Sequence, residues 1–267
     1  MSAVHRDRMR LDGKVAVITG AGGGIGRAIA VEFADAGAKL VLVGRNEEML
    51  AATAAVLNGA ETRLVAADVS RSEDVRRVVA EATGAFGTID VLVANHGVEG
   101  TVARLTDYPE EEFDRVIAIN LRGTFLLMRH VLPVMLEHGS GSIVNLGSVA
   151  SERGLIGTSA YIASKHGILG LTRNAAAEYG NSGIRINTIN AGMVDTRMLR
   201  AICAAHAPDD VEGMLDVIAG VAPLSRLASP EEVATVALFL ASDAASFVNG
   251  AAWEVDGGAL NTMGGGW

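Results

Sequence analysis

The sequence predicts an α/β fold with a single domain over residues 1–267, in which helices cover both faces of a doubly wound, seven-stranded parallel sheet. Short apolar runs alternate with longer helical patterns along the whole chain. Apolar strands separated by helices are typical of a parallel sheet that is covered on both faces. No linker-like stretch interrupts the alternation, so the order of elements favours one domain with the Rossmann arrangement.

The expected elements follow from these runs in chain order. The strands share a short apolar centre and are expected at 15–19, 39–44, 62–68, 90–95, 141–148, 185–192 and 251–255. The helices are expected at 25–37, 46–58, 72–87, about 109–137, 159–180 and from Pro230 onward. Residues 193–222 are expected to be irregular, and the "GGG" run at 264–266 to be a flexible or interface-docked tail.

The composition excludes several classes of protein. Hydrophobic residues make up 49% of the chain and charged residues 20%, which is enough apolar material for a core and unlike a disordered chain. The net charge of −9, without a basic block, disfavours nucleic acids and anionic membranes as partners. The single cysteine, Cys203, rules out an internal disulfide and fits a reducing compartment. Because the sequence shows neither a signal-peptide pattern nor an apolar run of about 18 residues, we expect a cytoplasmic protein with no membrane span.

A glycine-rich stretch, "VITGAGGGIGRAIA" at 17–30, stands where the first strand turns into the first helix. Its glycines, Gly20, Gly24 and Gly26, follow the pattern T-G-x-x-x-G-x-G and do not match G-x-G-x-x-G. Glycines permit a tight turn and a close approach of the backbone, and a helix N-terminus presents free N–H groups to a phosphate. The stretch therefore predicts a pyrophosphate-binding loop; the alternative is a strand–helix turn without a ligand.

Three polar residues further along predict acid–base chemistry. Tyr161 and Lys165 are four residues apart on an expected helix, so they share one face. A nearby ammonium favours the phenolate, so we expect the pKa of Tyr161 to be lowered from its usual value of about 10. Ser148 ends the fifth expected strand, at the sheet edge where ligands bind in this architecture. The alternative for the Tyr–Lys pair alone is an exposed pair on a helix surface.

These motifs resemble the short-chain dehydrogenase/reductase family, and the resemblance extends over nearly the whole chain. The matching pieces occur in the family's order and spacing and are "TGAGGGIG" (19–26), "ADV" (67–69), "ANHG" (94–97), "IN" (119–120), "SV" (148–149), "YIASK" (161–165) and "INAGMVDT" (189–196). The resemblance implies an oxidoreductase that transfers hydride between a nicotinamide cofactor and a small alcohol or ketone.

The resemblance also implies four catalytic residues. Tyr161 would be the general acid/base, and Lys165 would bind the nicotinamide ribose and lower the pKa of Tyr161. Ser148 would hold the substrate oxygen. Asn120 would help to fix Lys165 through a water molecule, whereas the alternative for Asn120, as for Asn95, is a structural polar residue that satisfies backbone groups.

The cofactor site implied by the resemblance is larger. Asp68 would meet the adenine edge, Asn95 would line the floor of the site, and Thr196 would bind the nicotinamide carboxamide. The full set of expected cofactor-binding residues is Gly20, Gly24, Ile25, Gly26, Arg45, Asp68, Val69, Asn95, Gly97, Tyr161, Lys165, Gly192, Val194 and Thr196.

The choice between NADP and NAD depends on the end of the second strand. Relatives that prefer NAD carry an aspartate there, whereas this chain has Gly44 followed by Arg45, a base that can meet a 2′-phosphate. The sequence therefore favours NADP. The alternative is NAD, with Arg45 extended into solvent, because Gly23 provides no second base and Glu47 and Glu48 bring negative charge nearby.

Two departures from the family pattern lie near the expected site. His96 replaces the family's alanine in "ANHG", and Ala191 replaces the proline before Gly192. For His96 a structural role is favoured over a catalytic one. The remaining histidines show no metal-ligand spacing, so no catalytic metal is expected; they are His5, His130, His138, His166 and His206.

The substrate is expected to be a hydrophobic secondary alcohol or ketone, cyclic compounds included. In the family, the region at 193–222 is a lid over the substrate, and in this chain it is mostly apolar. Short sequence segments such as "NLRGTF" are similar to segments of bacterial reductases of cyclic diketones. The expected pocket residues are His96, Ala150, Ile156, Met193, Met198 and Leu199.

Two other functions stay open at this point. The first is reduction of a 3-oxoacyl thioester, which the absence of an Arg or Lys cluster in the lid region disfavours. The second, of a different class, is a redox-inactive dinucleotide-binding sensor or scaffold, which the complete set of four catalytic positions disfavours. The resemblance also implies a homotetramer or homodimer that forms through the two long helices and the last strand.

Overall fold

The computed structural model of the chain describes residues 8–261, without the side chains of residues 205 and 206. His5 and the glycines at 264–266 lie outside the described residues. A single sheet has the order β3-β2-β1-β4-β5-β6-β7, and every neighbouring pair is parallel. The strands are β1 Val15–Thr19, β2 Lys39–Gly44, β3 Thr62–Ala66, β4 Val91–Ala94, β5 Gly141–Leu146, β6 Ile184–Ala191 and β7 Ala252–Val255. The predicted seven-stranded Rossmann fold is confirmed.

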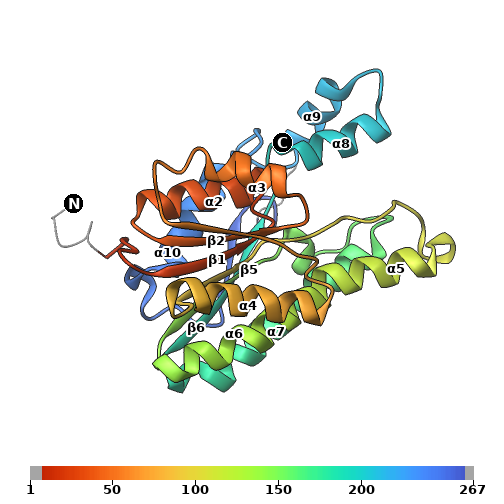
Figure 1. Cartoon of the computed structure of the whole chain (residues 1–267). Helices are drawn as coiled ribbons and strands as arrows, with labels where there is room; N and C mark the ends of the chain where they lie inside the picture. The colour runs from red at the N-terminus through yellow and green to blue at the C-terminus, as the bar shows by residue number, and fades with distance from the viewer. Residues whose placement is uncertain (1–7, 262–267) are drawn as a thin grey trace.

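Helices lie on both faces of this sheet (Figure 1). They are α2 Gly24–Asp35, α3 Glu47–Ala54, α4 Ser72–Phe86, α5 Glu110–Ile117, α6 Gly123–His138, α7 Ser159–Tyr179, α8 Arg197–His206, α9 Val211–Ala219 and α10 Pro230–Ala241. Helices α2, α3 and α10 bury their apolar side chains on one face, in a cluster with alternate residues of the strands. Helices α4, α6 and α7 do the same on the other face.

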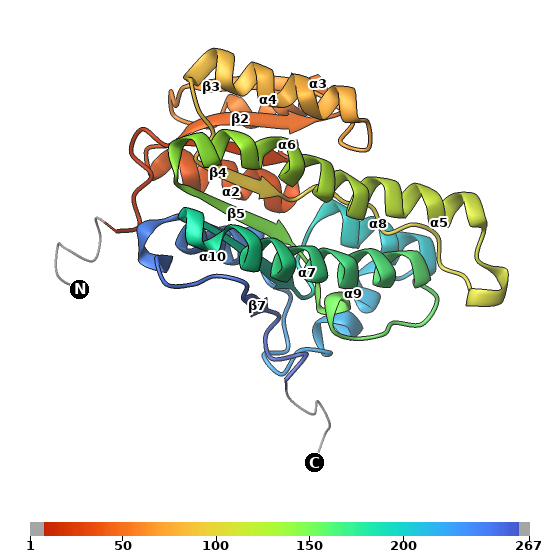
Figure 2. The ribbon, with the colours of Figure 1, turned by 90° about the horizontal axis from the view of Figure 1, so that it is seen from below.

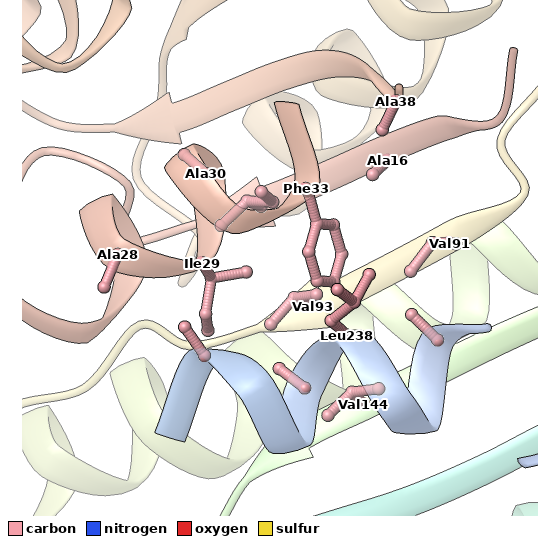
Figure 3. Packing of buried hydrophobic residues seen from close by; sticks show 14 of the residues in the cluster. Ala16, Ala28, Ile29, Ala30, Phe33, Ala38, Val91, Val93, Val144 and Leu238 are labelled. Atoms are coloured by element: carbon pink, nitrogen blue, oxygen red, sulfur yellow. The ribbon is translucent and has the colours of Figure 1, made fainter. Parts of the chain in front are cut away.

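The first of these clusters shows how the sheet is covered. Phe33 of α2 is completely buried and lies between the sheet and α10, close to Leu238 of α10 (Figure 3). Val93 of β4 and Val144 of β5 form the floor beneath them. Burial of one such side chain stabilises the fold by about 1.5–3 kcal/mol. A rigid sheet covered in this way holds the loops at its carboxyl edge in fixed positions.

The long helix expected at 109–137 is not uniform. It consists of α5 and α6 joined without a break by a π-helical turn, Ala118–Arg122. Helix α5 lies alongside α7 (Figure 2). Single π turns inside α-helices are frequent at functional sites, and this one contains the buried Asn120.

The region at 193–222, expected to be irregular, contains two helices instead. Thr196 caps α8 by accepting a hydrogen bond from the backbone N–H of Leu199, and Asp210 caps α9 by accepting from that of Gly213. The caps explain why segments of only ten and nine residues are helical here. Both helices stand beyond one end of the sheet (Figure 1). No helix within residues 8–261 is long and apolar enough to cross a membrane.

Candidate active site

The carboxyl ends of β1, β4, β5 and β6 meet at one edge of the sheet, as the parallel pairing requires. This edge brings together the glycine loop after β1, residues 95–97 after β4, Ser148 after β5 and residues 192–196 after β6. In open α/β sheets ligands bind outside this edge. The pieces of sequence that carried the family resemblance therefore converge on one place.

The glycine loop is too tightly packed for side chains. A Cβ on Gly26 would lie 2.2 Å from the carbonyl oxygen of Gly20 and 2.6 Å from Nδ2 of Asn95. Gly20 has a φ of +64°, in the left-handed region that favours glycine. Asn95 supports the loop from below, because its Nδ2 donates to the carbonyl oxygen of Thr19 at 3.1 Å. The loop can therefore approach a ligand with its backbone.

The first turn of α2 fits a pyrophosphate. No side chain caps this helix and its first turn contains no acidic residue, in contrast to α3, which Asn46 caps. Its free N–H groups remain available for an anion. Thr196 lies against the loop, since a Cβ on Gly24 would be 3.4 Å from its Cγ2. The donor set and the glycine cradle therefore fit a dinucleotide, and Ile25 anchors the turn by packing against the core.

The predicted catalytic side chains lie together at the edge formed by β5 and α7. Ser148 is buried and caps the short turn that follows β5, where its hydroxyl accepts from the N–H of Ala150. Lys165 is also buried, and its Nζ lies 5.5 Å from the ring centroid of Tyr161. The same Nζ donates to the carbonyl oxygen of Leu146 at 2.7 Å. The ammonium therefore has a fixed position next to the tyrosine.

Asn120 is held from several sides by hydrogen bonds. Its Oδ1 accepts from the N–H of Val98 at 2.9 Å, and its Nδ2 donates to the carbonyl oxygen of Val98 at 2.8 Å. Nδ2 also donates to Oγ of Ser164 at 3.1 Å. Gly97 lies between Asn120 and Lys165, since a Cβ on it would be 3.6 Å from Oδ1 and 3.9 Å from Nζ. Asn120 thus joins the loop after β4 to α7.

Burial sets the protonation of the central pair. It raises the pKa of Tyr161 to about 12, an effect that the neighbouring Ser148 hydroxyl opposes and the charge of Glu99 increases. Burial also lowers the pKa of Lys165 to about 8. The expected lowering of the Tyr161 pKa is therefore wrong for this structure, because loss of solvation outweighs the hydrogen bond from Ser148. The phenol is protonated at neutral pH.

Glu99 belongs to this region and was missed by the sequence analysis. Its side chain is half-buried, and burial raises its pKa to about 7. Its charge acts on Tyr161. The available signal was a lone carboxylate in "GVEG", two residues after Gly97. Acidic residues are common in loops, so this signal had no specificity without the fold.

His96 is buried behind the glycine loop. Its Nδ1 lies 2.9 Å from Oγ1 of Thr19, and its Nε2 would be 2.8 Å from a Cβ on Gly123. Burial, followed by the charge of Lys165, lowers the pKa of His96 to about 3. The ring is therefore neutral and packed against β1 and the start of α6. This position differs from the substrate pocket in which the sequence analysis placed His96.

Other expected pocket residues are dispersed. Ala150 has no exposed surface and Ile156 is 95% exposed, so neither lines a pocket. Ala150 instead supports Ser148, and Ile156 points outward because it lies on a loop before α7. Met193 and Leu199 are half-buried, and Met198 is 46% exposed at the start of α8.

The remaining residues of the expected cofactor site differ in burial and in hydrogen bonding. The Arg45 side chain is exposed and makes no hydrogen bond or ion pair to residues 8–261. Oδ1 of Asp68 accepts from the N–H and hydroxyl of Ser70, while the neighbouring Val69 is buried. Val194 is buried in the core as well.

Gly192 is required for packing. A Cβ on it would lie 2.7 Å from the Cα of Asp256, just after β7. Its N–H donates to the carbonyl oxygen of Val255 at 2.9 Å. Gly192 therefore holds the loop after β6 against the segment after β7. Within residues 8–261, no group of three His, Cys, Asp or Glu side chains is placed to hold a metal ion.

Known proteins are similar to this chain in sequence and in fold. A family model described as "Enoyl-(Acyl carrier protein) reductase" matches residues 20–260. Levodione reductase of Leifsonia aquatica is 42% identical over 262 residues, which cover 97% of this chain and 98% of that protein.

Solved structures agree. The crystal structure of levodione reductase matches with a TM-score of 0.93 and 41% identity, covering 95% of this chain and 100% of that one. L-sorbose reductase from Gluconobacter frateurii, complexed with NADPH and L-sorbose, matches with a TM-score of 0.91 and 34% identity, covering 96% and 100%. This chain therefore belongs to the short-chain dehydrogenase/reductase family of oxidoreductases, which bind a nicotinamide cofactor.

Proposed function

We propose that this enzyme interconverts a secondary alcohol and a ketone, with Tyr161 as the general acid/base. The observation that carries the proposal is the cluster in which the buried side chains of Ser148 and Lys165 lie next to the half-buried Tyr161. Similarity to a levodione reductase and an L-sorbose reductase supports the reaction class. The bound cofactor would supply or accept the hydride.

The residues of the chain would transfer the proton, orient the substrate oxygen and hold the cofactor. In reduction, the Tyr161 hydroxyl would donate its proton to the substrate oxygen while the Ser148 hydroxyl orients that oxygen. With a pKa of about 12, the phenol has this proton in place at neutral pH. In oxidation the proton would travel the other way, and the Lys165 ammonium would favour the transient phenolate. Lys165 would also bind the cofactor ribose, and Asn120 would hold the loop at residues 97–98 in position.

We propose a hydrophobic substrate, cyclic alcohols and ketones included. The lid presents Met193, Met198 and Leu199 from the segment that begins α8. Its basic Arg200 is already paired with Asp195 and Glu212, at 2.8 and 3.0 Å. The second arginine of the lid, Arg197, is exposed and makes no ion pair within the described residues. A 3-oxoacyl thioester is therefore the second candidate, and the description of the matching family model names a carrier-bound acyl group.

Three further properties extend the proposal. NADP is favoured over NAD because Arg45 is exposed and free to meet a 2′-phosphate. A cytoplasmic location fits the single, buried Cys203. A homotetramer or homodimer fits an apolar groove of about 420 Å³ between α5–α6 and α7, lined by residues that include Leu121, Phe125 and Leu171. Sedimentation as a monomer at micromolar concentration would contradict the assembly.

Replacement of Tyr161 by Phe tests the mechanism. We expect turnover to fall by about 10²–10⁴-fold, because the proton donor is lost, while cofactor binding measured by fluorescence is kept. Tyr179→Phe, at the far end of α7, is the matched control and keeps full activity. Unchanged turnover of Tyr161→Phe would remove this residue from the mechanism.

A panel of substrates tests the reaction class and the cofactor together. Cyclic and aryl ketones, their alcohols and a 3-oxoacyl thioester are each assayed with NADP(H) and with NAD(H). We expect activity on cyclic or aryl compounds. Activity on the thioester alone would establish the second candidate instead.

A further inference from the structure

Glu99 lies on a loop whose backbone is fixed on both sides. The preceding residue, Val98, exchanges two hydrogen bonds with Asn120. The following residue, Gly100, has a φ of +81°, and a Cβ on it would lie 2.6 Å from Oη of Tyr108. The loop is therefore held between the π-helical turn and the segment before α5. The same loop reaches the catalytic side chains, since a Cβ on Gly97, two residues before Glu99, would lie 3.9 Å from Nζ of Lys165.

The carboxyl of Glu99 has no partner of its own. Across residues 8–261 it makes neither a hydrogen bond nor an ion pair, although it is half-buried and its charge reaches Tyr161. Two other partly buried acids are paired, Asp74 with Arg77 at 2.9 Å and Glu112 with Arg115 at 2.7 Å. A carboxyl group that is withdrawn from water without a partner destabilises the fold. Its position therefore indicates a partner that arrives from outside the chain.

The loop that carries Glu99 is tied to a second loop. The N–H of Ala103 donates to the carbonyl oxygen of Gly157 at 3.0 Å, so the loop carrying Glu99 is joined to the loop before α7. Val102 lies on this junction, where it packs against Gly157. On the second loop, Arg153 donates to the carbonyl oxygen of Leu260 at 3.0 Å. Glu99 is thus the acidic residue of a loop that is tied to the segment before α7.

We propose that Glu99 is a substrate-binding residue that accepts a hydrogen bond from a second hydroxyl group of the substrate, remote from the carbon that exchanges hydride. This inference rests on the proposed alcohol/ketone activity. A carboxylate oxygen is a strong acceptor for a hydroxyl, and such charge-assisted bonds are about twice as strong as neutral ones. The same carboxylate would repel a substrate that carries its own carboxylate at that position.

Matched substrates separate this role from a structural one. The cyclic series is cyclohexanol, cyclohexane-1,4-diol and 4-hydroxycyclohexanecarboxylate, and the open-chain series is hexan-2-ol, hexane-2,5-diol and 5-hydroxyhexanoate. The variants are Glu99→Leu and Glu99→Gln, with the exposed Glu111→Gln as the control. We expect Glu99→Leu to lower kcat/KM for the diols about tenfold through KM and to leave the simple alcohols within about twofold, which is the loss of one such hydrogen bond.

The glutamine variant sharpens the test. Glu99→Gln keeps an acceptor without the charge, so we expect a smaller loss on the diols and a gain of about tenfold on the carboxylates. An equal loss of kcat on simple alcohols and diols would show that Glu99 acts on Tyr161, and would overturn the proposal. So would unchanged diol selectivity in both variants. No turnover of any of the six compounds by the unchanged enzyme would overturn the proposed activity and this inference with it.

Discussion

The inner part of the site and its outer rim are built in different ways. The inner part, defined as Gly26, Asn95, His96, Asn120 and Lys165, is enclosed by the chain. Asn120 has no exposed surface and makes three hydrogen bonds, and the Lys165 ammonium is bound to a backbone carbonyl. A change of any of these side chains therefore acts on the fold as well as on the reaction.

The outer rim, defined as Arg45, Glu99, Ile156 and Met198, has few such ties. Arg45 and Glu99 make no hydrogen bond or ion pair within the described chain, and Ile156 is 95% exposed. The fold does not need these side chains. The comparison teaches that the inner residues are tied into the core, whereas the side chains of the outer rim can be changed with less effect on the fold.

The largest expected effect concerns the pH dependence of the inner part. The pKa of His96 is lowered to about 3 in the folded protein and is about 6.5 when unfolded. Its contribution to stability is present above pH 6.5 and is lost as pH falls toward 3. We expect about 3 kcal/mol to be lost between pH 7 and pH 4 through this residue.

His96→Ala, which restores the family's residue, measures this contribution. The urea unfolding free energy of the variant should change less between pH 7 and pH 4 than that of the unchanged protein. The exposed His138→Ala should retain the original pH dependence. Parallel curves for His96→Ala and the unchanged protein would show that the ring is not buried as a neutral group.

The next effect tests the packing of the glycine loop. Gly26→Ala would place a Cβ 2.2 Å from the carbonyl oxygen of Gly20, and a backbone atom cannot move away easily. We expect the unfolding free energy to fall by about 2 kcal/mol and cofactor binding to be lost.

Gly84→Ala is the matched control, because its Cβ would meet nothing within 4 Å in the last turn of α4. This change should stabilise the protein by about 0.5–1 kcal/mol. Equal stability of the two variants would mean that the loop is less tightly packed than the contacts indicate. Calorimetric titration with the cofactor supplies the binding measurement.

The same division explains what the sequence could predict. Gly26, Ser148, Tyr161 and Lys165 were found because their spacing along strands and helices fixes where they meet in a parallel sheet. The π-helical turn around Asn120 was missed, since "AINLR" has ordinary helical composition and the turn depends on tertiary contacts.

The sequence pattern also could not predict the pKa of Tyr161 or the exposure of individual side chains. The raised pKa of Tyr161 results from burial, which depends on how α7 packs against the segment after β5. The sequence analysis expected Ala150 and Ile156 in the substrate pocket. Their exposure, none and 95%, is decided by the path of the loop. Glu99 was missed for the same reason.

At the rim, Arg45 offers a smaller effect on selectivity alone. We expect Arg45→Ala to lower the ratio of kcat/KM for NADP to that for NAD about tenfold, equivalent to about 1.4 kcal/mol, without a change in stability. Arg76→Ala, on the exposed face of α4, should leave the ratio unchanged. An efficiency with NAD tenfold above that with NADP in the unchanged enzyme would reverse the cofactor proposal.

The smallest expected effect is the loss of folding stability that the ionised Glu99 carboxylate causes at high pH. Its pKa is raised from 4.5 to about 7, so the folded state favours the protonated form. Stability associated with this group is full below pH 4.5 and is lost as pH rises through 7. Because the side chain is only half-buried, solvent screening limits the loss to about 1 kcal/mol.

Glu99→Gln should therefore be more stable than the unchanged protein at pH 8 and equally stable at pH 4, as measured by urea unfolding. Glu111→Gln should show no such difference. If the unfolding free energies of Glu99→Gln and the unchanged protein differ by the same amount at both pH values, the Glu99 carboxyl is fully in contact with solvent. Glu99 would then not be a partly buried group of the outer rim.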